Sequence, residues 1–198
     1  MEILDNIFPL SYQNMLRDTL LSQDWQWHYW HATCDYHLQN GVSLTDDNTI
    51  CVTENTQESP QLVYSFYNDD TRTPHFELVR PYIHLFEQAT GTEIKRLIRI
   101  KANLLAPEKN YPQNFHHTIH IDDSKPNHKS FLYYVNDCDG DTLFFDKLFD
   151  KDLQTLKLKH KQSPKQGTGV FFDSRLYHCS SPPSKTARVV INMVFENA

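Results

Sequence analysis

A histidine and an aspartate stand two positions apart in the middle of the chain, at His120 and Asp122. If this segment is extended, side chains two positions apart point to the same face, so both can reach one point in space. A second histidine, His178, follows much later. Two imidazoles and one carboxylate form the facial triad that suits non-haem Fe(II) and leaves coordination positions open for substrates. The sequence therefore predicts a metal centre built from His120, Asp122 and His178.

An arginine, Arg188, lies ten residues after that histidine in the apolar run RVVINMVF. A buried guanidinium needs an anion, and its planar fork can hold a carboxylate through two parallel hydrogen bonds. An ion pair with an acidic side chain of the core is the structural alternative. Because strand residues two apart share a face, Asn192 is expected to line the same pocket as Arg188.

Two helices followed by many short strands are expected to position these residues. Residues 11–22 and 76–88 carry apolar residues at helical spacing, with Ser11 as a cap of the first helix and Gly91 closing the second. Strand patterns are predicted at 97–104, 118–121, 131–135, 142–145, 153–158, 170–172 and 188–195. The expected fold is α+β, with a double-stranded β-helix (jelly roll) core and N-terminal supporting helices.

The N-terminal half is less regular than the C-terminal half. Residues 25–30 alternate as in a half-buried strand, and we interpret their three tryptophans as packing onto the core rather than as a sugar or base platform. Short strands are expected near Ile50 and Leu62. We predict one domain over residues 1–198, with 1–92 mainly helical support and 93–198 the jelly-roll core.

Composition limits the classes of partner and the compartment. A formal charge of −6 argues against a sequence-independent grip on nucleic-acid phosphates. Four cysteines without a CxxC pair indicate free thiols in a reducing compartment. The first residues lack the basic segment of a signal peptide, and no 18 apolar residues run together. A cytoplasmic protein without a membrane span is therefore expected.

The order of motifs resembles a known family. After His120 and Asp122 come the aromatic segment FLYYVN, the acidic turn DCDGD, then TLFF, QGTGVFFD, the distal His178 and the arginine-bearing RVVINMVF. This order resembles the Fe(II)- and 2-oxoglutarate-dependent dioxygenases, specifically the prolyl-4-hydroxylase-like class and its compact phage and marine-microbial members. The resemblance spans about residues 96–195, and the first 90 residues resemble the family only loosely.

The resemblance implies roles for individual residues. His120, Asp122 and His178 would be the iron ligands, and 2-oxoglutarate would chelate the iron while its far carboxylate pairs with Arg188. Tyr134 resembles the family tyrosine whose hydroxyl assists that carboxylate. The family often has another tyrosine on the strand before the HxD motif, and Asn103 is the polar residue available here. O2 and an ascorbate-like reductant complete the implied requirements.

The implied reaction is hydroxylation of an unactivated C–H bond. The substrate would be a prolyl or other residue in a peptide, or a free amino acid or small metabolite. Arg175 and Tyr177, just before His178, are candidates for the substrate side, and residues 124–127 and 55–72 could close over it. His116 and His117 are excluded from the metal site, because the odd spacing of His117 and His120 turns the two side chains to opposite faces.

Other classes remain as alternatives. A non-catalytic binding module on the same fold would be expected to lose a ligand or the arginine, and this chain keeps all four. A zinc hydrolase or thiol enzyme using Cys179 lacks the HExxH motif and any spaced Cys–His signature. A nucleic-acid demethylase of the AlkB type carries a second arginine six residues beyond its 2-oxoglutarate arginine, and no arginine follows Arg188.

Overall fold

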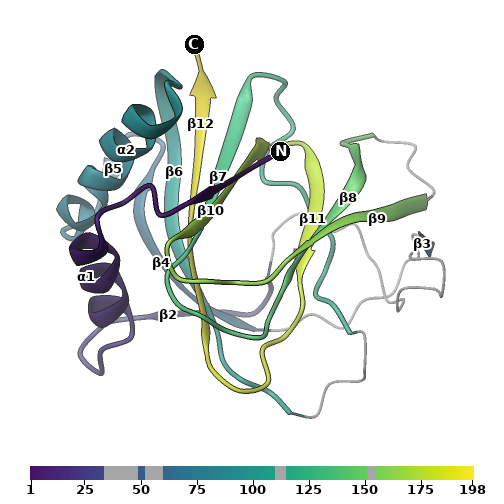
Figure 1. Cartoon of the computed structure of the whole chain (residues 1–198), viewed down its shortest axis with the longest axis horizontal. Helices are drawn as coiled ribbons and strands as arrows, with labels where there is room; N and C mark the ends of the chain where they lie inside the picture. Colours follow the sequence, from purple (N-terminus) through teal and green to yellow (C-terminus); the bar gives the residue numbers. More distant parts are fainter. Residues whose placement is uncertain (34–48, 52–59, 110–114, 151–154) are drawn as a thin grey trace.

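The fold is seen in a computed structural model of the whole chain. The structure describes residues 1–33, 49–51, 60–109, 115–150 and 155–198. Two antiparallel sheets face each other, and two helices cover the outer face of the larger sheet (Figure 1). The predicted α+β class is therefore confirmed.

The larger sheet has eight strands in the order β1-β10-β7-β12-β6-β4-β2, with β5 paired to β4. Its strands are β1 (Glu2–Asp5), β2 (His28–Trp30), β4 (Gln61–Asn68), β5 (Thr71–Arg72), β6 (Ile94–Leu105), β7 (His128–Tyr134), β10 (Thr168–Asp173) and β12 (Arg188–Asn197). The long central strand β12 pairs with β6 on one side and β7 on the other. It is therefore the strand around which the sheet is arranged.

The smaller sheet has four strands in the order β11-β8-β9-β3. These are β3 (Thr49–Cys51), β8 (Thr142–Leu148), β9 (Thr155–Gln162) and β11 (Leu176–Ser180). The chain crosses from one sheet to the other between β7 and β8, β9 and β10, β10 and β11, and β11 and β12. These repeated crossings place the inner faces of the two sheets opposite each other.

Strand β12 is buried on both faces, and its period of two separates them. Val189, Ile191 and Met193 belong to the large aromatic and aliphatic cluster beneath the helices, whereas Val190 packs in a separate cluster with residues of the inner face. The inner face of β12 also carries Arg188 and Asn192. The alternation therefore gives one face to the core and the other to a polar cavity.

The helices are held to the sheet by apolar packing and by one buried hydroxyl. α1 (Leu10–Leu20) buries Leu16 and Leu20, and α2 (Phe76–Thr90) buries its own apolar face in the same cluster. Tyr82 of α2 donates toward the carbonyl oxygens of Phe131 and Ile191, at 3.2 and 3.3 Å. Its burial raises the pKa well above the usual tyrosine value, so the hydroxyl stays a donor.

The helix boundaries follow the sequence closely, with one error at a cap. Gly91 ends α2 in the left-handed region at φ 68°, as predicted. The predicted Ser11 cap is wrong, because α1 begins at Leu10 behind Pro9, and no side chain caps it. None of the described helices is long and apolar enough to cross a membrane.

Three strand predictions need correction. Residues 118–121 form no strand and contribute only an isolated bridge between His120 and His178. Strand β11, which carries His178, was not predicted, because LYHCS lacks an apolar–polar alternation. The strand expected at 25–30 is only His28–Trp30 and is exposed, since it lies at the edge of the sheet, while Trp25 packs 4.8 Å from Tyr64 between ring centres.

The N-terminal half contributes more than helices. Residues 1–92 hold both helices, and also β1, β2, β4 and β5 of the larger sheet and β3 of the smaller one. The strands expected near Ile50 and Leu62 correspond to β3 and β4. Part of the lid expected at 55–72 lies outside the described residues, and the rest forms β4 and β5. The division into one domain with those two segments stays a prediction.

Gly169 offers a test of the sheet packing. A Cβ added there would lie 2.3 Å from Cε2 of Phe131, a fully buried ring on the neighbouring strand. We expect Gly169→Ala to lower the free energy of unfolding by roughly 1–3 kcal/mol, the usual cost of overpacking. Urea unfolding followed by tryptophan fluorescence measures it. In a Phe131→Leu background the same substitution should cost clearly less, and an equal cost in both backgrounds would contradict the overlap.

Candidate metal centre and its cavity

A pair of backbone hydrogen bonds brings His120 and His178 together. The amide of His120 donates to the carbonyl of His178, and the amide of His178 donates back to His120, both at 2.9 Å. The amide of Asp122 is held in the same way by the carbonyl of Ser174, also at 2.9 Å. The HxD segment is thus positioned by two residues of the β10–β11 region rather than by membership of a sheet.

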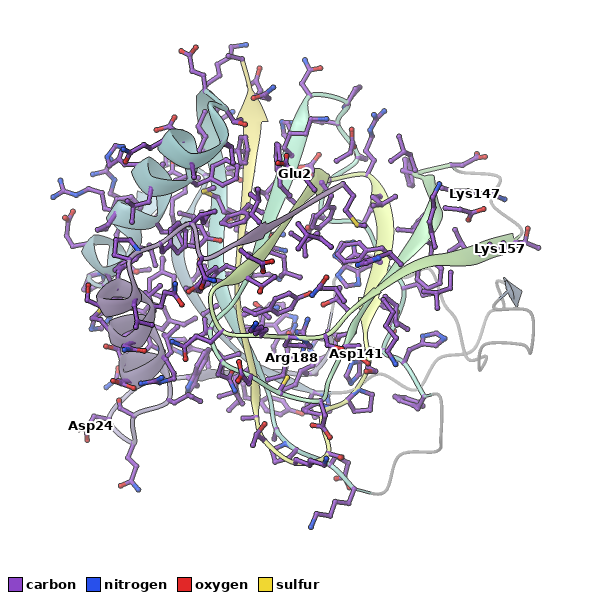
Figure 2. All side chains as sticks on the ribbon, in the orientation of Figure 1. Glu2, Asp24, Asp141, Lys147, Lys157 and Arg188 are labelled. Carbon is purple, nitrogen blue, oxygen red and sulfur yellow. The ribbon has the colours of Figure 1, made fainter. Side chains whose placement is uncertain are left out.

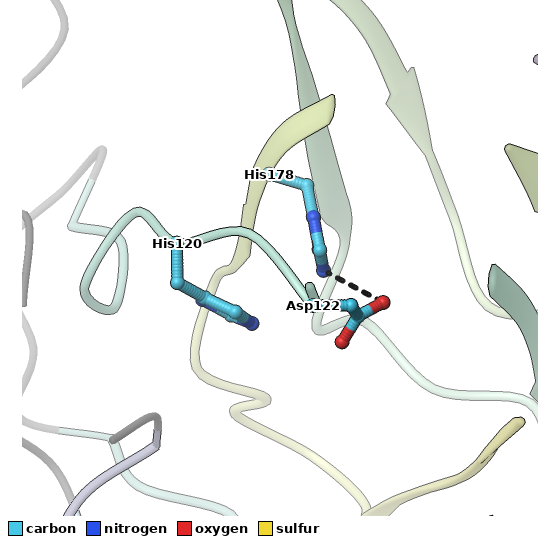
Figure 3. A group of neighbouring side chains, drawn as sticks. All are labelled: His120, Asp122 and His178. Carbon is cyan, nitrogen blue, oxygen red and sulfur yellow. Dashed lines mark ion pairs between the residues drawn. The ribbon is translucent and has the colours of Figure 1, made fainter. Parts of the chain in front are cut away.

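The three side chains converge on one point (Figure 3). One donor atom from each of His120, Asp122 and His178 lies within 4.8 Å of the others. Nε2 of His178 is 3.8 Å from Oδ2 of Asp122, and the two imidazole rings are 4.5 Å apart between centres. This spacing leaves room for one cation between three ligands and makes no direct hydrogen bond among them.

The tautomers of both histidines are set by the backbone. Nδ1 of His120 lies 3.0 Å from the carbonyl of Thr118, and Nδ1 of His178 lies 2.9 Å from the carbonyl of Leu176. A carbonyl only accepts, so each Nδ1 carries a hydrogen, and in the neutral ring the lone pair is then on Nε2. Burial, followed by the nearby His178, lowers the pKa of His120 to about 3, which keeps this imidazole neutral and able to bind a metal.

Asp122 is a buried carboxylate with one oxygen unsatisfied. Oδ1 accepts from Nδ2 of Asn192 at 2.8 Å and from Nη2 of Arg99 at 3.4 Å, whereas Oδ2 has no hydrogen-bond partner. Burial would raise the pKa of Asp122, but His178, Arg99 and His120 outweigh it and lower the pKa to about 2. An ionised buried oxygen without a partner is costly unless a cation binds it. This donor set fits a divalent metal.

The candidate metal centre opens into a cavity of about 100 Å³ between the two sheets. Besides the three converging residues, its walls include polar and charged side chains from several strands: Gln61, Arg99, Lys101, Asn103, Thr142, Arg188 and Asn192. Leu105, Ile121, Leu132 and Val190 supply most of the apolar part of the wall. A pocket with a few convergent polar groups on a largely rigid sheet is the usual form of a small-molecule site.

Arg188 is buried at one end of this cavity, beside the turn that carries Asp141 (Figure 2). Its Nε donates to the carbonyl of Gly140 at 2.9 Å, and its Nη2 donates to the hydroxyl of Thr142 at 2.7 Å. Both partners are neutral, so these bonds orient the guanidinium without cancelling its charge. The alternative of a core ion pair finds no support in these contacts.

Thr142 joins Arg188 to Tyr134. The hydroxyl of Tyr134 donates to Oγ1 of Thr142 at 2.8 Å, and burial raises the pKa of Tyr134 to about 12, which keeps it protonated. A threonine hydroxyl has two lone pairs and one hydrogen. Since Tyr134 and Arg188 occupy the lone pairs, the hydrogen of Thr142 is left to donate toward the cavity that it lines.

The two predicted asparagines also lie in the cavity wall. Asn192 contacts Asp122, as described, and its Oδ1 is buried without a hydrogen-bond partner. Asn103 donates through Nδ2 to Gln61 at 3.0 Å, and its Oδ1 likewise lacks a partner. Both side chains therefore keep an acceptor for a ligand. Tyr134 is not among the lining residues and reaches the cavity wall through Thr142, and its assistance to a carboxylate stays a prediction.

Other predicted residues lie away from the cavity. Arg175 forms a two-point ion pair with Asp173, and Tyr177 is buried with its hydroxyl on the backbone of Asp150. Tyr177 precedes His178 on one strand, so the two side chains face opposite ways. His116 and His117 are buried outside the converging set, as expected. Cys179 differs from these residues in that it borders the cavity, but it is almost fully buried in an apolar cluster, which does not favour a thiol nucleophile.

Sequence analysis missed Thr142, Gln61, Arg99 and Lys101 in the cavity wall. A signal existed for two of them, because Arg99, Lys101 and Asn103 alternate along one strand and therefore share one face. No local pattern marks Thr142 or Gln61. Their place depends on how strands from different parts of the chain pair with one another.

One family model matches part of the chain. Residues 109–196 match the family model described as 2OG-Fe(II) oxygenase superfamily. No curated protein sequence matches the chain.

Solved structures share the fold. A prolyl hydroxylase from Trichoplax adhaerens, in complex with a peptide fragment of the hypoxia inducible factor oxygen degradation domain, superposes with a TM-score of 0.58, 12% identity and coverage of 99% of this chain and 83% of that one. A Pseudomonas putida prolyl-4-hydroxylase superposes with a TM-score of 0.50 at 14% identity, and the match covers 98% of this chain and 91% of that one. The third structure is the carbocyclase SnoK of nogalamycin biosynthesis, which is described as non-heme and alpha-ketoglutarate dependent. It superposes with a TM-score of 0.61 at 10% identity, and the match covers 99% of this chain and 79% of that one.

At these identities the structural likeness establishes the shared fold, and the predicted jelly-roll core is confirmed. The family match covers the HxD motif, the distal histidine and strand β12. Residues 109–196 are thus similar to the 2OG-Fe(II) oxygenase superfamily, and this likeness supports a 2-oxoglutarate-dependent dioxygenase.

Proposed function

We propose that the chain hydroxylates an unactivated C–H bond at an Fe(II) centre held by His120, Asp122 and His178. The observation that carries this proposal is the buried, ionised Oδ2 of Asp122 without a hydrogen-bond partner, in a group of three residues whose donor atoms lie within 4.8 Å of one another. Two neutral imidazoles and one carboxylate cancel only part of the charge of Fe(II) and occupy one face of it. When bound, the iron supplies the positions at which 2-oxoglutarate chelates and O2 is activated.

The protein's own contribution to the metal is orientation. The carbonyls of Thr118 and Leu176 fix both imidazole rings through Nδ1, and Asn192 fixes the carboxylate through Oδ1. Such partners of the ligands hold each donor atom in place before the metal arrives. The cost of arranging the ligands is therefore met during folding.

We assign the far carboxylate of 2-oxoglutarate to Arg188 and Thr142. Arg188 offers a permanent positive charge with neutral partners, and Thr142 offers the hydroxyl hydrogen that its two acceptor contacts leave over. Tyr134 supports this arrangement from behind by occupying a lone pair of Thr142. Asn103 and Asn192, each with an unpartnered Oδ1, would bound the same space and accept from a ligand or an ordered water.

The substrate is a residue of a peptide, such as a prolyl residue, or a small molecule. Both kinds are named among the structures that share the fold: the Trichoplax adhaerens structure holds a peptide fragment, and SnoK belongs to nogalamycin biosynthesis. O2 is the oxidant, and a reductant such as ascorbate would keep the iron ferrous. The alternative, a non-catalytic metal-binding module on the same fold, is disfavoured because the ligand set and Arg188 are all present.

The first prediction concerns the metal. Anaerobic addition of Fe(II) and then 2-oxoglutarate to the purified protein should produce a visible metal-to-ligand charge-transfer band. His120→Ala should lose the band, because one of three ligands is removed, whereas His84→Ala, on an exposed helix face, should keep it. A band of equal intensity in folded His120→Ala would mean that the iron is held elsewhere.

The second prediction concerns the co-substrate. Arg188→Gln should raise the 2-oxoglutarate concentration for half-maximal band intensity by about 10- to 150-fold, which corresponds to about 1.5–3 kcal/mol for charge-assisted hydrogen bonds. Arg96→Gln, an exposed arginine on β6, is the matched control and should leave it unchanged. An unaltered 2-oxoglutarate requirement in Arg188→Gln would assign the far carboxylate to another group.

The third prediction separates Thr142 from Tyr134. Thr142→Val keeps the volume but removes the hydroxyl, and should raise the 2-oxoglutarate requirement by about 5- to 10-fold, as expected for one hydrogen bond of about 1 kcal/mol. Tyr134→Phe should have a smaller effect, because its hydroxyl reaches the ligand only through Thr142. Titration of the charge-transfer band measures both, and a larger effect of Tyr134→Phe would contradict this order.

A further inference from the structure

Arg99 is a cavity residue that neither iron nor 2-oxoglutarate uses. It alternates with Lys101 and Asn103 along β6, so the three side chains share the inner face of the strand, and all three line the cavity. Asn103 lies toward Arg188, whereas Arg99 lies beside Asp122. The presence of a guanidinium at this second end of the cavity needs its own explanation.

Arg99 and Arg188 extend from opposite ends of the paired strands β6 and β12. On β12 the residue opposite Arg99 is Val194, whereas Arg188 pairs with Leu105 at the other end of β6. From 188 to 194 the strand advances roughly 20 Å, at about 3.3 Å per residue. 2-Oxoglutarate spans only about 5 Å between its carboxyl carbons, on C–C bonds of about 1.5 Å. The side chains also have different partners, since Arg188 contacts Gly140 and Thr142 whereas Arg99 contacts Asp122.

The hydrogen-bonding capacity of Arg99 is largely unused. Nη2 reaches Oδ1 of Asp122 at 3.4 Å, a long contact to an oxygen that already accepts from Asn192 at 2.8 Å. Nε is buried and has no hydrogen-bond partner. A guanidinium carries five N–H donors, and a buried donor left without a partner costs free energy. With 27% of the side chain exposed, Arg99 remains accessible to a ligand from the cavity.

The charged residues of the cavity wall also favour a ligand at Arg99. Among the described lining residues, Arg99, Lys101 and Arg188 are cationic and Asp122 is the one carboxylate. The charges of Fe(II) and of the 2-oxoglutarate dianion cancel each other, so loading the site would not change the net charge of the cavity. The chain as a whole has a formal charge of −6. A cationic cavity in an acidic protein suits an anionic ligand.

We propose that Arg99 binds an oxyanion of the primary substrate, a carboxylate or a phosphate, so that the substrate is an anionic small molecule rather than a neutral peptide segment. The planar guanidinium suits two-point recognition of either anion. Lys101, one step nearer to Asn192 on the same face, adds a second cation to the subsite. The inference rests on the proposed function, because it places the substrate beside the assigned iron ligands.

A competing explanation gives Arg99 a purely local task, namely holding Asp122 in place. In that case the loss of Arg99 would disturb iron and 2-oxoglutarate binding and would not depend on the charge of the substrate. Asp122 keeps its shorter hydrogen bond from Asn192 when Arg99 is replaced. The two explanations therefore differ in what a charge-removing substitution changes.

The experiment uses the full chain loaded anaerobically with Fe(II) and 2-oxoglutarate. The probes are the free proteinogenic amino acids, their carboxamides, and the phosphate monoesters of serine and threonine. Each is titrated for a shift of the charge-transfer band and then tested in air for stimulation of succinate formation. The variants are Arg99→Gln, Arg99→Lys and the exposed control Arg96→Gln.

We expect at least one anionic probe to shift the band and to bind about tenfold or more tightly than its uncharged counterpart. Arg99→Gln should weaken that probe by about tenfold or more and erase its preference over the uncharged counterpart, with the 2-oxoglutarate titration unchanged. Arg99→Lys should retain part of the preference, and Arg96→Gln all of it. Whether carboxylates or phosphate monoesters respond identifies the anion.

Several outcomes would overturn the subsite. They are equal binding of charged and uncharged probes, failure of every anionic probe in protein that shows the band, or an Arg99→Gln variant that changes only the 2-oxoglutarate titration. The last of these would leave Arg99 as a positioning residue for Asp122. Absence of the band in the wild-type protein would instead contradict the proposed function, so the two failures are distinguishable.

Discussion

The reciprocal backbone hydrogen bonds between His120 and His178 are the constraint on which the site depends. They join a segment outside the sheets to β11, and so place two imidazoles from distant parts of the sequence side by side. Strand β11 is itself fixed by its pairing with β8, and β8 carries Thr142 at the other end of the site. A shift of β11 by one residue would turn His178 away from the cavity and bring Tyr177 or Cys179 toward it, because neighbouring strand residues face opposite ways. The register of one short strand therefore decides whether there is a metal centre at all.

The buried charge of Asp122 is stabilised in two ways, by hydrogen bonds to one oxygen and by a cation at the other. Asn192 and Arg99 satisfy one oxygen from the larger sheet, and the other oxygen is left for a cation. The histidines obey the same logic, since each uses Nδ1 within the protein and reserves Nε2. Each of the three side chains thus uses one polar atom in a hydrogen bond within the protein and leaves its other polar atom available to a metal. An apolar core would not produce such a pattern, because unsatisfied buried polar atoms cost free energy without giving any packing in return.

The sequence predicted which side chains converge at the centre of the cavity but not most of those in its walls. His120, Asp122, His178 and Arg188 could be identified because their residue types and order restrict the chemistry, and the alternation along β12 correctly placed Asn192 beside them. Thr142 and Gln61 could not be identified, because each is a polar residue near the start of a strand and its role depends on cross-strand partners. Strand β11 escaped prediction for a related reason: its residues serve a ligand position and two different buried surfaces, so its pattern follows the site and not the period of a half-exposed strand. For Tyr134 the residue type was informative, and the structure adds that its hydroxyl donates to Thr142, while its role toward a carboxylate stays a prediction.

The two arginines of the cavity differ in their hydrogen-bond partners and in their exposure, and these differences suit them to different ligands. Arg188 is enclosed by a carbonyl and a hydroxyl, neutral partners that fix its direction and leave its charge to whatever anion arrives. Arg99 is more exposed and lies against a carboxylate that the metal also needs, so its charge is shared before any ligand binds. A guanidinium held by neutral groups is suited to a ligand that binds deeply and in one orientation, as a co-substrate must. A guanidinium that is only loosely held can shift toward a ligand entering from the open side of the cavity, because giving up one long hydrogen bond costs little. Arg188 lies on β12 and Arg99 on the neighbouring strand β6. Their positions would therefore place 2-oxoglutarate and the substrate on different sides of the metal centre.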